Sequence, residues 1–331
     1  MSTVSRARGR LGPALFFGAL AIGSLTVLSR ADAALGPVRT AVTHRRLLPN
    51  ARAASSAHGL SRAVHMVTAL PSARVDVPLE LSGSPAGVQY EWVPVGSLAP
   101  VAVSRPLDGP IFAPSLPGFY RMQVTTNGER RVIDSLTIGV LKPMTEKRGS
   151  TINGYRMGFY RGEGRGDFGR SPAGFLEVRE GDASLPVSRH LVLEDFLTHD
   201  QQTTWPRYVA MDPRLLDKLE LVFDEIGRWR GNADASTVDV DVHSGFRTPL
   251  HNRRVPRAAG DSRHQYGDAA DIAVDANGDG RVTWVDVSLI ARAVESVERR
   301  HPDLIGGLGL YQGGSPYAHI DVRGHRARWR G

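Results

Sequence analysis

Two histidines and an aspartate in the C-terminal part of the chain could together hold a transition metal. His264 and Asp271 lie seven residues apart in "SRHQYGDAADI", and His319 lies in "YAHIDV". A lone histidine is usually structural, but two imidazoles and a carboxylate form a three-ligand set that leaves a fourth tetrahedral position for water. That arrangement is typical of a catalytic zinc. Because the chain has no cysteine, histidines and carboxylates must hold any such metal.

These residues belong to three ordered motifs, "SGFRTPLHN", "SRHQYGDAADI" and "YAHIDVRG". Their order and spacing resemble the zinc D-alanyl-D-alanine carboxypeptidases, and within that family the exported branch whose last motif is His-x-Asp. The resemblance covers about residues 186–331. It implies that His264, Asp271 and His319 bind Zn²⁺ and that the substrate is a peptidoglycan stem peptide, cut near or between D-amino acids.

The resemblance also implies roles for other residues. Arg247 would hold the substrate's carboxylate or the developing oxyanion, which suits a rigid guanidinium, and Ser262 would help to bind the substrate. Asp321 is expected on the same strand face as His319. It would be either the general base or a group that orients the imidazole of His319.

The last motif differs from that of other branches, which place a glutamate a few residues before the final histidine. The sequence "GGSPYAHID" has no carboxylate there. His243 and His325 are weaker candidates for a role in the site. A cell-wall-binding or scaffold protein that keeps the fold without turnover is therefore the alternative to a hydrolase.

A second metal is predicted directly after Asp271. The segment "DANGDGRVTWVD" fits the calcium-loop template over residues 275–286, with a glycine at position 6. An Asn/Asp/Gly-rich turn that needs no ion is the alternative. We expect a single structural Ca²⁺ that stiffens the segment carrying Asp271; its ligands would be Asp275, Asn277, Asp279, the backbone carbonyl of Arg281, and Asp286.

The pattern of elements predicts an α+β fold. The resemblance implies that the C-terminal domain, 186–331, is of the hedgehog and DD-peptidase type. It contains two amphipathic helical stretches, "DPRLLDKLELVFDEIGRW" and "WVDVSLIARAVESVERRH", and strands in "STVDVDVHSG", "GGLGLY" and "YAHIDV". A short helix is expected in "LVLEDFL".

The region before this domain has a different character. Residues 71–142 contain short alternating runs separated by Gly, Pro, Ser and Asn, which predict a small all-β sandwich of Ig-like type. Its aromatic residues, Tyr90, Trp92, Phe119 and Tyr120, are expected to fill the core. Residues 34–70 are interpreted as a linker, and 143–185 as a loop-rich connector with a strand around "GFLEV".

The N-terminal 33 residues have the order of a secretory signal: arginines, an apolar run, and small residues at Ala31 and Ala33. An uncleaved membrane anchor is the alternative. We expect an exported, envelope-associated protein that is free of the membrane after cleavage. The net charge of +7 favours anionic cell-envelope polymers as partners, and no nucleic-acid-binding motif is present.

Overall fold

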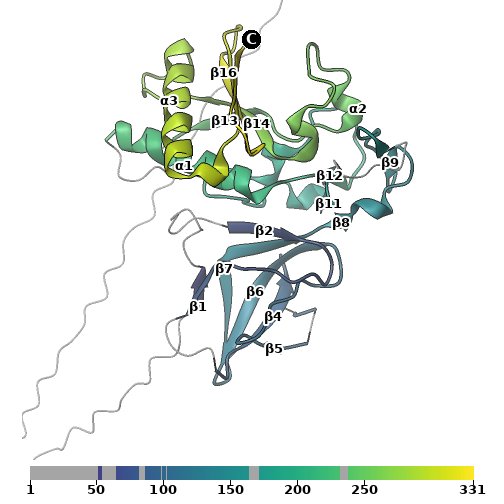
Figure 1. Cartoon of the computed structure of the whole chain (residues 1–331). Helices are drawn as coiled ribbons and strands as arrows, with labels where there is room; N and C mark the ends of the chain where they lie inside the picture. The colour runs from purple at the N-terminus through teal and green to yellow at the C-terminus, as the bar shows by residue number, and fades with distance from the viewer. Residues whose placement is uncertain are drawn as a thin grey trace, which may run out of the picture. The chain divides into compact units, whose positions relative to one another are not determined.

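The computed structural model in Figure 1 describes residues 51–53, 65–81, 86–97, 99–101, 103–163, 171–231 and 238–331. The predicted signal peptide, residues 1–33, lies outside these ranges. Within them, no helix combines the length and the apolar character that a bilayer-spanning segment needs. The described residues form a mixed α+β structure, as expected from the sequence.

The N-terminal β unit contains a five-stranded sheet of order β2-β7-β6-β4-β5 and a two-stranded sheet, β1-β3. Tyr90, Trp92 and Tyr120 are buried in a common core, against which Leu79 and Leu81 of β3 pack. Three of the four aromatic residues predicted for this core are therefore in it, whereas Phe119 is buried in the separate cluster that contains Leu176. The strands are β1 (Ala51–Ala53), β2 (His65–Ala69), β3 (Leu79–Leu81), β4 (Gln89–Pro94), β5 (Arg105–Pro106), β6 (Gly118–Thr126) and β7 (Glu129–Val140).

One boundary expected from the sequence is wrong. Residues 34–70 were predicted to be a linker, but β2 lies inside that range and pairs in parallel with β7 over five residues. The alternation in "HMVTA" is too short to distinguish a strand from a linker, and the pairing with a distant strand decides the structure.

Between residues 142 and 209, the elements that the structure describes are all short. The predicted strand around "GFLEV" is present as β11 and forms a three-stranded sheet of order β12-β11-β8. The elements are β8 (Lys142–Pro143), η1 (Met144–Glu146), β9 (Thr151–Ile152), β10 (Tyr155–Arg156), β11 (Gly174–Val178), η3 (Glu180–Asp182), η4 (Leu193–Phe196) and β12 (Arg207–Val209). The helix expected in "LVLEDFL" is the short 3-10 helix η4.

A five-stranded sheet of order β13-β14-β16-β15-β17 is the centre of the C-terminal domain. Its pairs are antiparallel except for β15 and β17, which run in parallel. Every residue of β14 is buried, which agrees with a central strand covered on both faces. The strands are β13 (Val240–Ser244), β14 (Ala269–Val274), β15 (Gly307–Tyr311), β16 (Tyr317–Asp321) and β17 (Ala327–Arg330).

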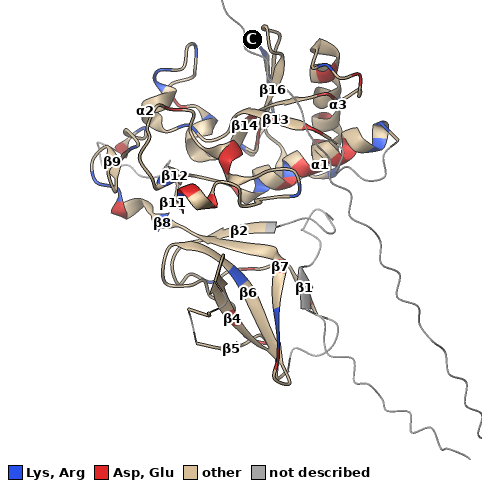
Figure 2. Cartoon of the chain, turned by 180° about the vertical axis from the view of Figure 1, so that it is seen from behind, with Lys and Arg blue, Asp and Glu red and all other residues tan. Residues whose placement is uncertain are grey.

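Two seventeen-residue helices, α1 (Pro213–Trp229) and α3 (Trp284–Arg300), pack against each other, and α3 contacts β14, β15 and β16. Both views place α3 on one side of the strands and the short helix α2 (Pro249–Asn252) on the other (Figures 1 and 2). The side chain of Asp212 caps α1 by accepting a hydrogen bond from the backbone N–H of Arg214. Blue and red segments mark the charged residues along α1 (Figure 2).

The turn between η6 (Arg263–Tyr266) and β14 depends on Gly267. Its φ is +73°, and a Cβ at this position would lie 2.0 Å from the backbone oxygen of Ala210. The backbone N–H of Asp212 donates to the Gly267 carbonyl at 2.9 Å, so the turn is fixed against the chain that leads into α1. This contact holds the segment that carries His264 and Asp271.

Gly267→Ala is therefore expected to lower the free energy of unfolding by about 2–5 kcal/mol, because left-handed backbone strain and a backbone clash add. Chemical denaturation followed by circular dichroism measures the change. The control is Gly260→Ala, since a Cβ there meets open space and its φ is ordinary; its effect should stay within about 1 kcal/mol. Equal losses in the two variants would contradict the proposed role of this turn.

Candidate metal centre

A single register row across the C-terminal sheet contains most of the candidate site. Asp271 of β14 lies opposite His319 of β16, and His319 lies opposite Gly309 of β15. Gly309 is in turn paired with Trp329 of β17, and on the other side Ser244 of β13 is paired with Asp271. A bulge between Val242 and Ser244 produces this last pairing. Pairing thus brings together residues from five strands.

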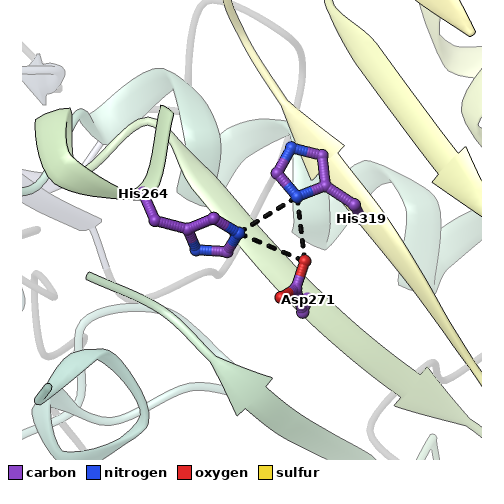
Figure 3. A group of neighbouring side chains, drawn as sticks. All are labelled: His264, Asp271 and His319. Atoms are coloured by element: carbon purple, nitrogen blue, oxygen red, sulfur yellow. Dashed lines mark hydrogen bonds and ion pairs between the residues drawn. The ribbon is translucent and has the colours of Figure 1, made fainter. Parts of the chain in front are cut away.

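His264 reaches the same point from outside the sheet. It lies in the 3-10 helix η6, and its ring is buried. Its Nδ1 lies 2.6 Å from the carbonyl oxygen of Gly245, the acceptor that fixes a proton on Nδ1. Nε2 then carries a lone pair and points toward Asp271 and His319 (Figure 3).

The three predicted ligands converge with spacings suited to zinc. His264 Nε2 lies 3.2 Å from Asp271 Oδ1 and 3.0 Å from His319 Nδ1, and His319 Nδ1 lies 2.8 Å from Asp271 Oδ1. Ligand atoms about 2.0–2.1 Å from a tetrahedral zinc are about 3.3 Å from each other. Within the described ranges, this is the one group of three or more such side chains whose ligand atoms converge.

Burial and charge set the protonation of this cluster. Burial lowers the pKa of His264, which favours the neutral imidazole that a metal requires. Burial alone would raise the pKa of Asp271, but His264 and His319 outweigh it and hold the pKa of that carboxyl well below its usual range. Burial lowers the pKa of His319, whereas its bonds to Asp271 and Asp321 raise it, and the net direction is upward.

Arg247 lies next to the cluster, as the resemblance implied. Its Nη2 donates to Asp271 Oδ2 at 2.5 Å, and its Nε donates to Ser244 Oγ at 2.7 Å. Its backbone N–H also donates to the carbonyl of His264 at 3.1 Å. Nη1 makes no hydrogen bond within the described part of the chain, so it is the donor left for a substrate. Ser262 caps η6 without a side-chain capping bond and is half-buried.

Asp321 lies behind His319, on the side away from Asp271 and His264. Its Oδ2 is 3.2 Å from His319 Nε2, whereas Nδ1 of the same ring points to the cluster. The carboxylate is fully buried and accepts hydrogen bonds from the backbone N–H of Gly307 and from Arg323. Burial would raise its pKa, but His319, Arg323 and the Gly307 N–H together outweigh burial and keep the pKa well below its usual range. The position favours orientation of the His319 ring over proton transfer.

Trp329 was not identified from the sequence, yet its ring centroid lies 5.1 Å from that of His319. A Cβ at Gly309 would lie 2.4 Å from Trp329 Cε2, so the indole occupies the space that a side chain at position 309 would fill. Trp329 Nε1 donates to Tyr311 Oη at 2.9 Å, and the Tyr311 ring stacks on Tyr317. An aromatic row thus borders the metal cluster. The alternating glycines in "GGLGLY" are the only sequence signal for it.

The weaker histidine candidates lie outside the cluster. His243 Nε2 pairs with Asp241 at 3.0 Å, and its ring contacts Tyr317 at 5.4 Å between centroids. His325 is exposed in the turn after β16. Neither ring has a ligand atom in the convergent group.

The predicted calcium loop folds as a turn whose carboxylates bind its own backbone. Asp275 accepts from the N–H groups of Gly278, Asp279 and Gly280. Asp286 is fully buried; its Oδ1 accepts from two loop N–H groups, and its Oδ2 accepts from the N–H and hydroxyl of Thr283. Nothing in this arrangement supports Ca²⁺, and the turn that needs no ion accounts for the bonds.

The remaining loop residues make similar bonds. The side-chain oxygen of Asn277 accepts from the N–H of Asp279, and Asp279 accepts from the N–H of Arg281. Calcium binding by these residues stays a prediction.

Comparison with known proteins gives one finding. Residues 194–297 match a family model described as Peptidase M15. The matched segment includes His264 and Asp271 and ends before His319. It supports a relation of this segment to the M15 zinc peptidases, without distinguishing the D-alanyl-D-alanine carboxypeptidase branch. No curated protein and no solved structure matches the chain.

The position of Asp321 generates the first prediction from this site. Asp321→Asn keeps the size of the side chain but removes the charge that faces His319 Nε2. Zinc affinity is expected to fall about 10–100-fold, as for other groups that orient a ligating histidine. Competition with a chromogenic chelator measures it on the purified chain.

Two control variants give the lower and upper limits of zinc binding in that measurement. His264→Ala should retain no stoichiometric zinc, whereas His325→Ala should bind zinc like the unmodified chain. If Asp321→Asn kept full zinc affinity but lost hydrolytic rate, Asp321 would be the base and the orienting role would be wrong.

The second prediction concerns Asp286, whose bonds cap α3. Asp286→Ala should lower the free energy of unfolding by at least about 2 kcal/mol in calcium-free buffer, because buried N–H groups lose a charged acceptor. Burial would raise the pKa of Asp286, but its hydrogen bonds outweigh burial and lower it. This contribution is therefore full above about pH 4 and is lost as the pH falls further.

Asp279→Ala separates capping from calcium binding, because its exposed side chain accepts from the Asn277 side chain and the Arg281 backbone, both within the loop, and does not cap α3. If Asp286 acts by capping α3, Asp279→Ala should lower the free energy of unfolding much less than Asp286→Ala does. Added calcium should then leave the stability of both variants unchanged. A calcium-dependent rise in melting temperature that both substitutions abolish would instead establish the calcium loop.

Proposed function

We propose that the chain is a zinc-dependent peptidase that hydrolyses peptide bonds involving D-amino acids in peptidoglycan stem peptides. The observation that carries this proposal is the convergence of His264 Nε2, His319 Nδ1 and Asp271 Oδ1 within 3.2 Å of one another, from a 3-10 helix and two strands. The M15 family match over the segment with two of these residues supports the peptidase class.

The proposal assigns a separate role to each residue of the site. His264, Asp271 and His319 would hold Zn²⁺, and when bound the ion activates water and polarises the scissile carbonyl. The carbonyl of Gly245 and the carboxylate of Asp321 fix the tautomers of the two imidazoles. Arg247 anchors Asp271 through Nη2, and its Nη1 makes no hydrogen bond within the described part of the chain. A carboxylate or a developing oxyanion of the substrate suits that donor.

The substrate class rests on the sequence motifs. The resemblance to D-alanyl-D-alanine carboxypeptidases implies a stem peptide with D-residues, and the signal-like N-terminus supports export to the compartment where that polymer lies. Carboxypeptidase and endopeptidase action are both compatible with one guanidinium beside the metal ligands.

A non-catalytic wall-binding protein is the second candidate, and one observation favours it. Among the described residues, Asp321 is the carboxylate nearest the cluster apart from the ligand Asp271, and it contacts the far side of the His319 ring. The described ranges therefore present no obvious general base. A binding protein would keep the metal and the fold without turnover.

The proposal predicts zinc-dependent cleavage of purified muropeptides, detected by mass spectrometry as released D-alanine or as an opened cross-link. Chelation should abolish cleavage and added Zn²⁺ should restore it, because three protein ligands leave one position for water. His264→Ala should lower the rate at least about 10³-fold, since the metal and its activated water are lost together.

The controls separate the two candidate functions. His325→Ala, outside the cluster, should cleave at the unmodified rate, and a stem peptide with L-alanine in place of the terminal D-alanine should resist cleavage. If the zinc-loaded chain sedimented with peptidoglycan but left every muropeptide intact, the wall-binding function would replace the hydrolase.

A further inference from the structure

Tyr317 places an open hydroxyl group beside the metal cluster. It lies two residues before His319 in β16, so both side chains are on the same face of the sheet. The Tyr317 ring is half-buried, and its hydroxyl makes no hydrogen bond to any described residue. The hydroxyl oxygen keeps contact with solvent. The proposed peptidase function gives this donor no role so far.

Stacked aromatic packing fixes the position of the hydroxyl. The centroids of the Tyr317 and Tyr311 rings are 4.5 Å apart, with an angle of 10° between the ring planes. The His243 ring also contacts Tyr317, at 5.4 Å between centroids. Tyr311 is held in turn, because its Oη accepts a hydrogen bond from Trp329 Nε1 at 2.9 Å. A side chain that is fixed before binding loses little conformational entropy when it contacts a ligand.

The hydroxyl lies within electrostatic range of two charged residues of the site. Burial raises the pKa of Tyr317 to about 12, and Asp271 contributes to the rise, whereas Arg247 opposes it. Tyr317 is therefore protonated at neutral pH and can donate a hydrogen bond. Because the charges of Asp271 and Arg247 both act on it, the hydroxyl lies near the Arg247 guanidinium.

Arg247 provides a second open donor. Its Nη2 and Nε are occupied by Asp271 and Ser244, whereas its Nη1 makes no hydrogen bond within the described ranges. Arg247 follows β13 and Tyr317 belongs to β16, so the two residues reach the site from the strands on either side of β14. Two donors on either side of one strand can each serve one oxygen of a carboxylate.

The charges near the two donors are compatible with an anion. Asp271 is paired with Arg247, so its negative charge is compensated. The side chain of Asp241, on β13, is 74% exposed and lies 3.0 Å from His243 Nε2, so solvent screens its charge. Among these residues, an incoming carboxylate meets no buried, unpaired negative charge.

The spacing from the ligand atoms indicates which substrate group the two donors serve. The Tyr317 hydroxyl makes no hydrogen bond to any of the three ligand residues, whose ligand atoms lie within 3.2 Å of one another. The scissile carbonyl must lie beside those atoms, whereas a C-terminal carboxylate lies one residue farther along the peptide. The position of the hydroxyl therefore suits the carboxylate.

We propose that Tyr317 Oη and Arg247 Nη1 together bind the free C-terminal carboxylate of the substrate. This inference rests on the proposed peptidase function and deepens it, because it makes Tyr317 a residue that selects carboxypeptidase substrates over endopeptidase substrates. A bond within a cross-link presents no terminal carboxylate to the two donors. Tyr317 acts on substrate binding and holds neither the metal nor its ligands.

The test compares two peptides, a tripeptide with blocked amino groups that ends in D-alanyl-D-alanine and the same tripeptide with a C-terminal carboxamide. Isothermal titration calorimetry on the full, metal-free chain measures Kd without hydrolysis. Tyr317→Phe keeps the stacked ring and removes the hydroxyl. It should raise Kd for the acid peptide at least about tenfold, because a hydrogen bond to a charged group is lost. Kd for the carboxamide should change much less.

The zinc-loaded chain gives a second measurement. Tyr317→Phe should raise KM for the acid peptide by a similar factor and leave kcat unchanged, because the lost contact is to a part of the substrate that does not react. Competition with a chromogenic chelator should show the zinc affinity of the unmodified chain, which separates lost substrate binding from damage to the metal cluster.

Tyr311→Phe is the matched control, because it removes a hydroxyl from the same stacked pair that is already bonded to Trp329. It should leave the ratio of the two Kd values unchanged. Equal weakening of both peptides by Tyr317→Phe, or an unchanged ratio, would overturn the proposal. A lower kcat with unchanged KM and Kd would overturn it too, and would assign the hydroxyl to the developing oxyanion. Selective binding of the acid peptide without any zinc-dependent hydrolysis would contradict the peptidase function alone.

Discussion

The antiparallel register of β14 and β16 is the constraint on which the rest of the site depends. It places Asp271 opposite His319, and their partners on either side extend the row to Ser244 and Trp329. Because side chains alternate between faces, a slip of one residue would turn one ligand to the helix side and separate the pair. The bulge in β13 places Ser244 opposite Asp271. Without it, His243 would lie opposite Asp271, and Arg247 would lose its hydrogen bond to Ser244.

A buried ionic network supports this register from behind. The ammonium group of Lys218, on α1, is fully buried and donates to Glu298 of α3 and to the backbone oxygen of Asp321, both at 2.7 Å. Glu298 also pairs with Arg328 of β17. Burial of such charges is costly, so the network adds little net stability, but loss of one member would leave another unpaired. The network thus connects α1, α3 and β17 to the backbone of Asp321 in β16, the residue whose carboxylate contacts His319.

The sequence predicted the elements that have strong local signals. Both long helices start where Asp212 and Thr283 cap them, and the three ligands converge as the motifs implied. The failures concern non-local pairing. β2 was missed because five residues give too little alternation, and Trp329 because its place follows from the parallel pairing of β15 with β17, which no motif reports. The calcium-loop prediction stays a prediction: Asp286 accepts hydrogen bonds from Thr283 and from the loop backbone, and the side-chain types of the template do not decide between an ion and a turn that needs none.

The same alternation gives the C-terminal sheet two chemically different faces. On β15 and β17, Gly309 and Trp329 lie on the face with the two imidazoles and the carboxylate, whereas Leu308, Arg328 and Arg330 lie on the face toward α3. Trp329 touches both environments: its ring contacts His319 at 5.1 Å, the Arg323 guanidinium lies 5.3 Å from its centroid, and it borders a hollow that residues of α3, β15 and β17 line. Arg323 in turn holds Asp321. A ligand that moved Trp329 would therefore act on the orientation of His319 through packed side chains, which is the physical connection that coupling between the two faces requires.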